Sequence, residues 1–169
     1  MSLDLNNPAW DFALEFYGQP GMSDACLTLQ DQIDADIVGL VMVLFCWARR
    51  RQSLSQQEIA TLASAMQDWR AATVLPLRRI RRDLKSARAD LPQDTKEILR
   101  STVKKAELLA EQIHIAMIFA LLPPMNRTVP VDDLGVVIRR FLSQEWAGDV
   151  PKSCQIAIGS IVRTVALSD

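Results

Sequence analysis

One stretch of the chain constrains its fold more than any other, because residues 37–48 carry no charge, amide or hydroxyl. They read Ile-Val-Gly-Leu-Val-Met-Val-Leu-Phe-Cys-Trp-Ala. A surface helix shows one apolar stripe, so a segment that is apolar on every side is expected to be buried on every side. The run is too short to cross a bilayer, which takes about 20 residues. Asp34 and Asp36 precede it and arginines 49–51 follow it, as the helix macrodipole favours. The run therefore predicts a central helix inside a soluble helical bundle.

The composition favours helices and a single domain. Six glycines and one tyrosine argue against an all-β chain, whereas the many Leu, Ala, Arg and Gln residues favour helices. A length of 169 residues fits one domain with a substantial core. We therefore expect an all-α fold, a single-domain bundle over residues 1–169 with seven or eight helices.

Start and stop signals predict the two helices before the central one. Asn7 followed by Pro8 offers a capping amide and a proline in the first turn. Gly18 and Pro20 mark the end of that helix. A second helix is expected over about residues 21–33.

A long helix is expected to begin after Ser55, which has capping-box spacing with Glu58. Its apolar seam recurs in steps of three and four: Ile59, Leu62, Met66, Trp69, Thr73, Leu77, Ile80, Leu84, Ala87 and Leu91. The seam keeps its phase past Pro76, although a proline inside a helix costs about 3 kcal/mol. No Gly, Asn or Ser stands nearby to build a turn. We interpret the segment as a long helix kinked at Pro76, and the alternative is a tight break that raises the number of helices from seven to eight.

A second long helix is expected after Pro92, with a capping box formed by Asp94 and Glu97. Its predicted seam is Ile98, Thr102, Ala106, Leu109, Ile113, Met117 and Ala120. The prolines at positions 123 and 124 end it.

Charge is distributed unevenly, although the net charge is only −1. Residues 1–48 hold seven acids and no Lys or Arg, which gives −7, and residues 49–88 hold ten bases and three acids, which gives +7. Two interpretations stay open. Either the two segments face each other or form solvated surfaces, or the basic segment is a partner-binding surface.

The basic segment contains the best candidate for such a surface. Its bases lie opposite or beside the seam residues Leu77, Ile80 and Leu84. They are Arg78, Arg79, Arg81, Arg82, Lys85 and Arg88. A stripe of this kind suits an acidic protein partner or a phosphate backbone. The acidic isoelectric point and the lack of aromatic residues between the bases argue against nucleic acid.

The densest acidic cluster is formed by Asp31, Asp34 and Asp36. Asp31 and Asp34 would share a face of a continuing helix, and carboxylates at that spacing can hold Mg²⁺. This supports the alternative hypothesis of a metal-dependent enzyme. We favour the structural hypothesis, in which Asp34 or Asp36 caps the central helix and Asp31 is solvated or pairs with an arginine.

No motif points to a cofactor. His114 is the only histidine, and its helical neighbours are apolar, so we expect a packed side chain instead of a catalyst or metal ligand. The chain has no Gly-rich phosphate loop, no Gly-x-Ser-x-Gly elbow and no Walker-type lysine. We therefore expect no cofactor and no catalytic residue.

The cysteines and the N-terminus indicate a reducing compartment. Cys26, Cys46 and Cys154 are odd in number, far apart and set among apolar residues, which predicts buried free thiols. The first residues lack both the basic region and the apolar core of a signal peptide. A cytoplasmic location is the expectation.

Several motif blocks carry a resemblance to a known family. The blocks are Trp10-x-Phe12 with Tyr17-x-x-Pro20-Gly21, Ala25-Cys26-Leu27-x-Leu29-Gln30-Asp31, Asp36, Trp47, Trp69-Arg70, Val74-x-Pro76-Leu77-Arg78 and Arg81-Arg82-x-Leu84-Lys85. Together they resemble a small proteobacterial family of helical proteins known as a domain of unknown function, over about residues 8–88. Val38 and Gly39 depart from it, since a polar asparagine is expected there. The resemblance implies a bacterial cytoplasmic protein, and it implies no activity or catalytic residue.

The leading functional hypothesis is therefore a non-enzymatic protein-interaction module that uses the basic helix as its contact face. A metal-dependent enzyme built on Asp31, Asp34 and Asp36 is the first alternative. Nucleic-acid binding through the basic helix is the second. The oligomeric state does not follow from the sequence.

Overall fold

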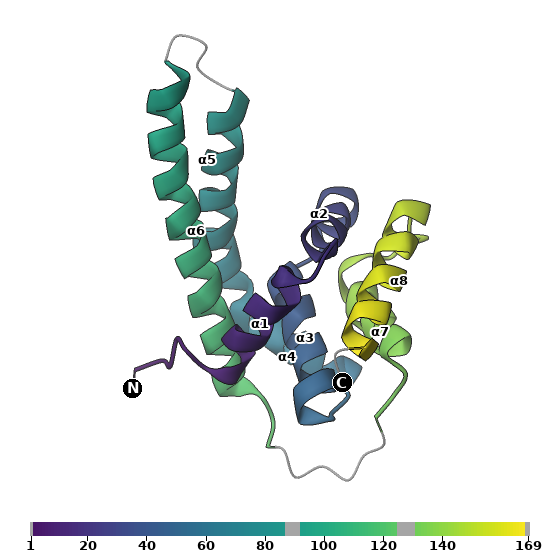
Figure 1. Ribbon diagram of the computed structural model, residues 1–169. Helices are drawn as coiled ribbons and strands as arrows, with labels where there is room; N and C mark the ends of the chain where they lie inside the picture. The colour runs from purple at the N-terminus through teal and green to yellow at the C-terminus, as the bar shows by residue number, and fades with distance from the viewer. Residues whose placement is uncertain (1, 87–91, 125–130, 168–169) are drawn as a thin grey trace.

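The computed structural model describes residues 2–86, 92–124 and 131–167, and within these ranges it contains helices and no strand (Figure 1). In chain order they are α1 (Pro8–Gly18), α2 (Met22–Ile33), α3 (Ile37–Arg50), α4 (Gln56–Trp69), the π-helical turn η1 (Arg70–Val74), α5 (Leu75–Ser86), α6 (Gln93–Leu121), α7 (Leu134–Glu145) and α8 (Lys152–Leu167). The expected all-α fold is confirmed.

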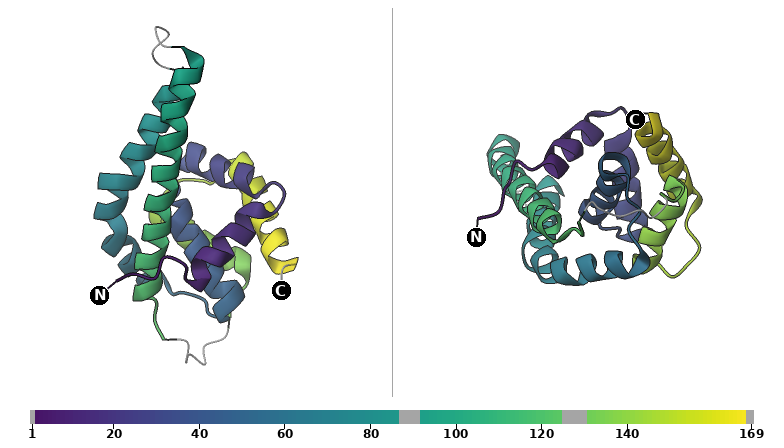
Figure 2. Two further views of the ribbon diagram at one scale, coloured as in Figure 1. Left: turned by 60° about the vertical axis from the view of Figure 1, so that its left-hand side comes forward. Right: turned by 90° about the horizontal axis from the view of Figure 1, so that it is seen from below.

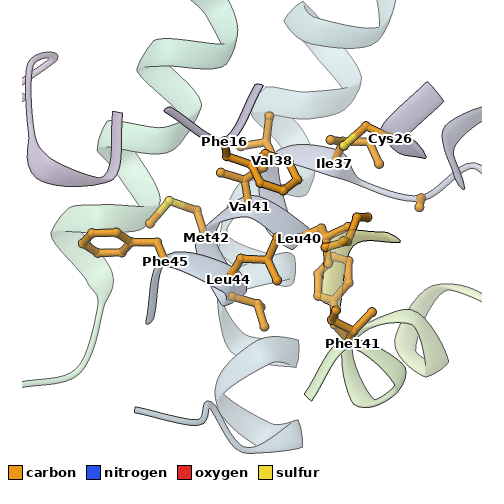
Figure 3. Packing of buried hydrophobic residues seen from close by; sticks show 14 of the residues in the cluster. Phe16, Cys26, Ile37, Val38, Leu40, Val41, Met42, Leu44, Phe45 and Phe141 are labelled. Atoms are coloured by element: carbon orange, nitrogen blue, oxygen red, sulfur yellow. The ribbon is translucent and has the colours of Figure 1, made fainter. Parts of the chain in front are cut away.

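Helix α3 is the centre of the molecule, as the apolar run predicts. Every residue from Leu40 to Cys46 is at most 3% exposed. The helix packs against α1, α2, α6, α7 and α8. Figure 3 shows its side chains reaching Phe16 on one side and Phe141 on another. Asp36 caps the helix by accepting a hydrogen bond from the backbone N–H of Val38 at 3.2 Å. A helix enclosed by other helices needs apolar residues on every side, which explains the uninterrupted run.

Two predicted helix starts are confirmed by their hydrogen bonds. The Asn7 side chain accepts from the backbone N–H groups of Ala9 and Trp10 at 3.0 and 3.1 Å. Ser55 Oγ accepts from the Glu58 N–H at 3.3 Å, and Glu58 Oε2 accepts from the Ser55 N–H at 2.8 Å. The second pair is a complete capping box.

The predicted start of α6 is wrong in detail. The helix begins at Gln93, with Pro92 at the capping position and no side-chain cap. Asp94 therefore already lies in the first turn and cannot act as the N-cap. Glu97 pairs with Arg100 at 3.0 Å instead of closing a capping box.

Helices α4 and α5 form one helical run through η1. The backbone N–H of Leu75 bonds to the carbonyl of Arg70, five residues earlier, which is the hydrogen bond of a π-helix. Pro76 follows directly; it has no N–H, and in a regular α-helix its ring meets the carbonyl of Ala72. The wide turn makes room for the ring, and the helix axis changes direction there (Figures 1 and 2). The kinked helix is confirmed, and the run does not break.

The π turn also shifts the buried face of α5, so the predicted seam holds only in part beyond it, where Leu77 and Leu84 are half-buried. An extra residue in one turn rotates all later side chains relative to the earlier turns. Ile80, a predicted seam residue, is 47% exposed, whereas Val74 is buried. Arg78 and Arg81 turn toward α6. The predicted seam therefore keeps its phase past Pro76 only in part, because the pattern assumes a regular helix.

The predicted seam of α6 is wrong as well. Ile98 is 72% exposed and Leu109 is half exposed, whereas α6 buries Glu107, Ala110 and His114. The N-terminal half of α6 lies beside α5 and away from the other helices (Figure 1). Apolar residues in that half have a single neighbouring helix to pack against, so several stay exposed.

The molecule consists of a body around α3 and a projecting hairpin. The hairpin is formed by α5 and the antiparallel N-terminal half of α6 (Figures 1 and 2). In the body, α2 packs against α8, and α7 packs against α3, α4 and α8. Among the described helices, none combines the length and the apolar character that crossing a membrane requires.

Candidate functional site

The six bases of the predicted contact face do not share one environment. Three are exposed on α5, namely Arg79, Arg82 and Lys85. The Arg79 side chain is 85% exposed, but the side chains of Arg78 and Arg81 are only 11% and 24% exposed. Arg88 lies outside the described residues. The bases thus divide into an outward set and an inward pair.

The inward pair binds two glutamates of α6, and we call this cluster the α5–α6 clasp (Arg78, Arg81, Glu107 and Glu111). Arg78 Nε lies 3.1 Å from Glu107 Oε1, and Arg78 Nη2 lies 2.6 Å from Glu111 Oε1. Arg81 donates to both carboxylate oxygens of Glu107. Glu107 is 5% exposed. Removing one partner of such a buried set leaves an uncompensated charge, so the clasp fixes α5 against α6.

The two glutamates of the clasp have pKa values shifted in opposite directions. Burial alone would raise the pKa of Glu107, but hydrogen bonds and charge from Arg81 and Arg78 hold it below its usual value. Burial raises the pKa of Glu111, because the lowering effect of Arg78 is too small to reverse it. Catalytic carboxylate pairs also show opposite shifts. Here both carboxylates accept hydrogen bonds from Arg78, which is the arrangement of a structural ion-pair network.

The predicted acidic cluster is divided between helix ends and arginines. Asp34 ends α2 in the left-handed conformation, with φ of 49°, and Asp36 caps α3. Arg70 lies 3.9 Å from Asp34 and 3.7 Å from Asp36. Arg82 lies 2.6 Å from Asp31 and thereby joins α5 to α2. Over the described ranges, no group of three or more His, Cys, Asp or Glu side chains is placed to hold a metal ion.

His114 is fully buried, as expected, but its surroundings are not purely apolar. Burial lowers the pKa of His114, the charge of Asp36 opposes this shift, and the charge of Arg70 adds to it. Neither ring nitrogen has a hydrogen-bond partner in the part of the chain that the structure describes. Sequence reasoning missed this grouping, because the three residues come from α6, the start of α3 and η1. The one sequence signal for this grouping is that Asp36 and Arg70 both belong to the motif blocks that carry the family resemblance.

The three cysteines are buried and free, as predicted. Burial raises the pKa of the Cys26 thiol to about 12 and that of the Cys46 thiol to about 11. A hydrogen bond with Tyr17 lowers the first and Arg50 lowers the second, but burial outweighs both. Burial also raises the pKa of Cys154. All three stay protonated at neutral pH, so none is poised as a thiolate nucleophile.

Comparison with known proteins places this site inside a family. Residues 8–118 match a family model whose description is "Protein of unknown function (DUF2390)". The match extends past residue 88, where the motif blocks end, and includes both glutamates of the clasp and His114. No curated protein and no solved structure matches the chain.

Proposed function

Because the chain belongs to the family of proteins of unknown function (DUF2390), we propose its role from its geometry. It is a non-enzymatic interaction module that presents the outer side of the α5–α6 hairpin to an acidic protein partner. One observation carries the proposal: the hairpin projects from the body with Arg79 and Lys85 exposed on it. Arg82 is exposed as well, beside its ion pair with Asp31, and Arg79 lies 3.9 Å from Asp83. Arg88 is included in the proposed contact face from the sequence pattern.

The clasp supports the proposal by making the hairpin a preformed surface. Arg78 and Arg81 enter the proposal as the residues that hold α5 against α6. A surface that is already ordered loses less conformational entropy on binding. Ile80, 47% exposed beside Arg79, adds apolar area next to the charges. The matching partner is an acidic segment with apolar residues, because complementary charge steers association and buried apolar contacts hold the complex.

Two competing functions have weaker support. A nucleic-acid role would use the same exposed bases, but Arg78 and Arg81, which would extend the basic stripe, are engaged by glutamates. A metal-dependent enzyme would use aspartates that lie beside arginines. The three buried thiols support a cytoplasmic location, which we include in the proposal.

The test is crosslinking inside cells, followed by capture of the tagged full chain and mass spectrometry. The hairpin variant carries Arg79→Glu and Lys85→Glu. The matched control carries Arg139→Glu and Arg163→Glu, two exposed bases on α7 and α8. Both variants change the net charge equally, so a difference between them reports the position of the charge.

We expect the parent and the control to capture the same acidic protein, and the hairpin variant to recover on the order of tenfold less of it. Equal recovery by both variants would show that the hairpin face is not the contact. Recovery that disappears after nuclease treatment would replace the protein partner with a nucleic acid.

A further inference from the structure

A pocket of about 500 Å³ opens at the end of the molecule opposite the hairpin tip. It lies where α1, the C-terminal end of α3 and the C-terminal end of α6 meet. Small-molecule sites commonly have volumes of about 300–1,000 Å³ and sit between helices of bundles. Most of its lining is apolar, including Pro8, Leu122 and Pro123. The site is separate from the proposed contact face on the hairpin.

Three phenylalanines form one wall of the pocket. The ring of Phe45 lies 5.9 Å from that of Phe12 and 5.9 Å from that of Phe119, measured between centroids, at interplanar angles of 61° and 58°. Figure 3 shows Phe45 directed away from the other labelled core residues, toward α6. Phe12 and Phe45 are only 6% and 3% exposed, so the half-buried Phe119 presents the most open ring of this wall to an aromatic or branched apolar group.

Four charged residues line the pocket, and two of them neutralise each other. Arg49 forms an ion pair with Glu15, and its guanidinium lies 5.8 Å from the centre of the Phe12 ring. Asp11 is exposed to water and lies in the first turn of α1, where the helix dipole favours a negative charge. The ion pair is neutral overall and Asp11 is in contact with water, so neither requires a charged ligand.

Arg50 is the remaining charge, and the groups that it contacts directly are neutral. It is half-buried, and its Nη2 donates to the carbonyl of Pro123 at 2.5 Å. It also contacts the Cys46 thiol, whose pKa of about 11 keeps it uncharged. Within the described residues, Arg50 forms no ion pair, and the carbonyl of Pro123 is the acceptor that partly balances its charge. A partly desolvated guanidinium gains from a carboxylate in bidentate geometry.

We propose that this pocket binds a small amphipathic carboxylate, whose aromatic or branched apolar body packs on Phe12, Phe45 and Phe119 and whose carboxylate pairs with Arg50. The size of the pocket and its apolar wall select the body of the ligand. Arg50, which forms no ion pair within the described residues, selects the head group. The Pro123 carbonyl fixes the guanidinium, so the pairing geometry exists before the ligand arrives.

The test uses 2-naphthoate as the probe, with 2-naphthamide and 2-naphthylmethylamine as neutral and cationic analogues of the same body. Calorimetric titration measures each against the full chain, against Arg50→Gln and against the control Arg139→Gln on α7. We expect naphthoate to bind at least about tenfold more tightly than the amide. Arg50→Gln should remove that preference and leave the affinity for the amide unchanged, and the control should behave as the parent does.

Three results would overturn the proposal: no saturable binding of either naphthoate or the amide, equal affinity for the two, or preference for the amine. If circular dichroism shows that Arg50→Gln does not fold, the affinities of the three probes for the parent still show which head group the site prefers. Competition titrations of the probes with the Phe119→Leu variant then test where they bind. The affinity changes if the probes bind against this wall, and it stays the same if they bind elsewhere.

Discussion

A single carboxylate, that of Glu107, accepts hydrogen bonds from two arginines in an almost fully buried position. The sequence pattern predicts both arginines at the surface, but both side chains form ion pairs with Glu107. Long-range pairing of this kind has no local sequence signal, since the partners lie 26 and 29 positions apart. The sequence does support the hypothesis that basic and acidic segments of the chain pair with each other. The ion pair of Arg82 with Asp31 is one example.

We expect Glu107→Gln to reduce the free energy of unfolding by about 3–5 kcal/mol, because two partly buried guanidinium groups then lose their shared counter-charge. The control is Glu97→Gln on the same helix, whose pair with Arg100 is more exposed. That change should cost less than about 1 kcal/mol. Urea unfolding measures both, and similar losses in the two variants would contradict a structural role for the clasp.

The buried imidazole of His114 predicts a loss of stability in mild acid. The unfolded chain binds a proton near the usual histidine pKa of about 6.5. The folded chain resists that proton, because burial lowers the pKa of His114. Stability is therefore fully present above that pH and is lost as the pH falls below it, by up to about 1.4 kcal/mol per pH unit.

The comparison is between the parent and His114→Leu in urea unfolding at about pH 7.5 and about pH 5.5. The parent should lose more stability between the two conditions than the variant does. Glu111, whose raised pKa acts with the opposite sign, is present in both proteins and cancels. Identical pH dependence would mean that the His114 side chain accepts its proton equally well in both states.

At the scale of elements, the turn η1 decides which residues of α5 face inward. Up to Trp69 the predicted seam is useful, since Ile59 and Met66 are buried and Leu62 is half-buried. Inside the π turn the buried position moves, since Val74 is buried and the seam residue Thr73 is only half-buried. A proline in a sequence signals a distortion, but it does not state whether the backbone widens, bends or breaks.

We expect Val74→Ala to cost at least about 1 kcal/mol of unfolding free energy, because it removes buried methyl groups. Ile80→Ala should change stability by less than about 0.5 kcal/mol, because that side chain is largely at the surface. The sequence pattern alone predicts the reverse order. Thermal and urea unfolding of the two variants therefore test the shift in phase directly, and a larger loss at Ile80 would refute it.

Elements that depend on local chemistry were predictable, and those that depend on distant neighbours were not. The run at residues 37–48 and the caps at Asn7 and Ser55 follow from a few adjacent side chains. Residues of α6 are exposed because the N-terminal half of the helix lies away from the body, and no local sequence pattern predicts that position. The same holds for His114, whose polar neighbours belong to other elements.

At the scale of the whole molecule, the charge asymmetry serves two purposes. Ion pairs join the acidic N-terminal segment to the basic segment, through Glu15 with Arg49 and Asp31 with Arg82. Exposed pairs of this kind contribute only about 0–1 kcal/mol each, so they orient the helices more than they stabilise them. Arg79 and Lys85 remain exposed on α5, and contact with another molecule is the second purpose that we propose.

Helix α6 connects two separate regions of the molecule. With 29 residues it is about 43 Å long at 1.5 Å per residue. Its middle and C-terminal part is buried against α1, α3 and α4, its first half stands in the hairpin, and Phe119 near its far end lines the pocket. One continuous helix therefore forms one arm of the hairpin and one wall of the pocket. A substitution that displaces α6 along its axis would alter both surfaces at once.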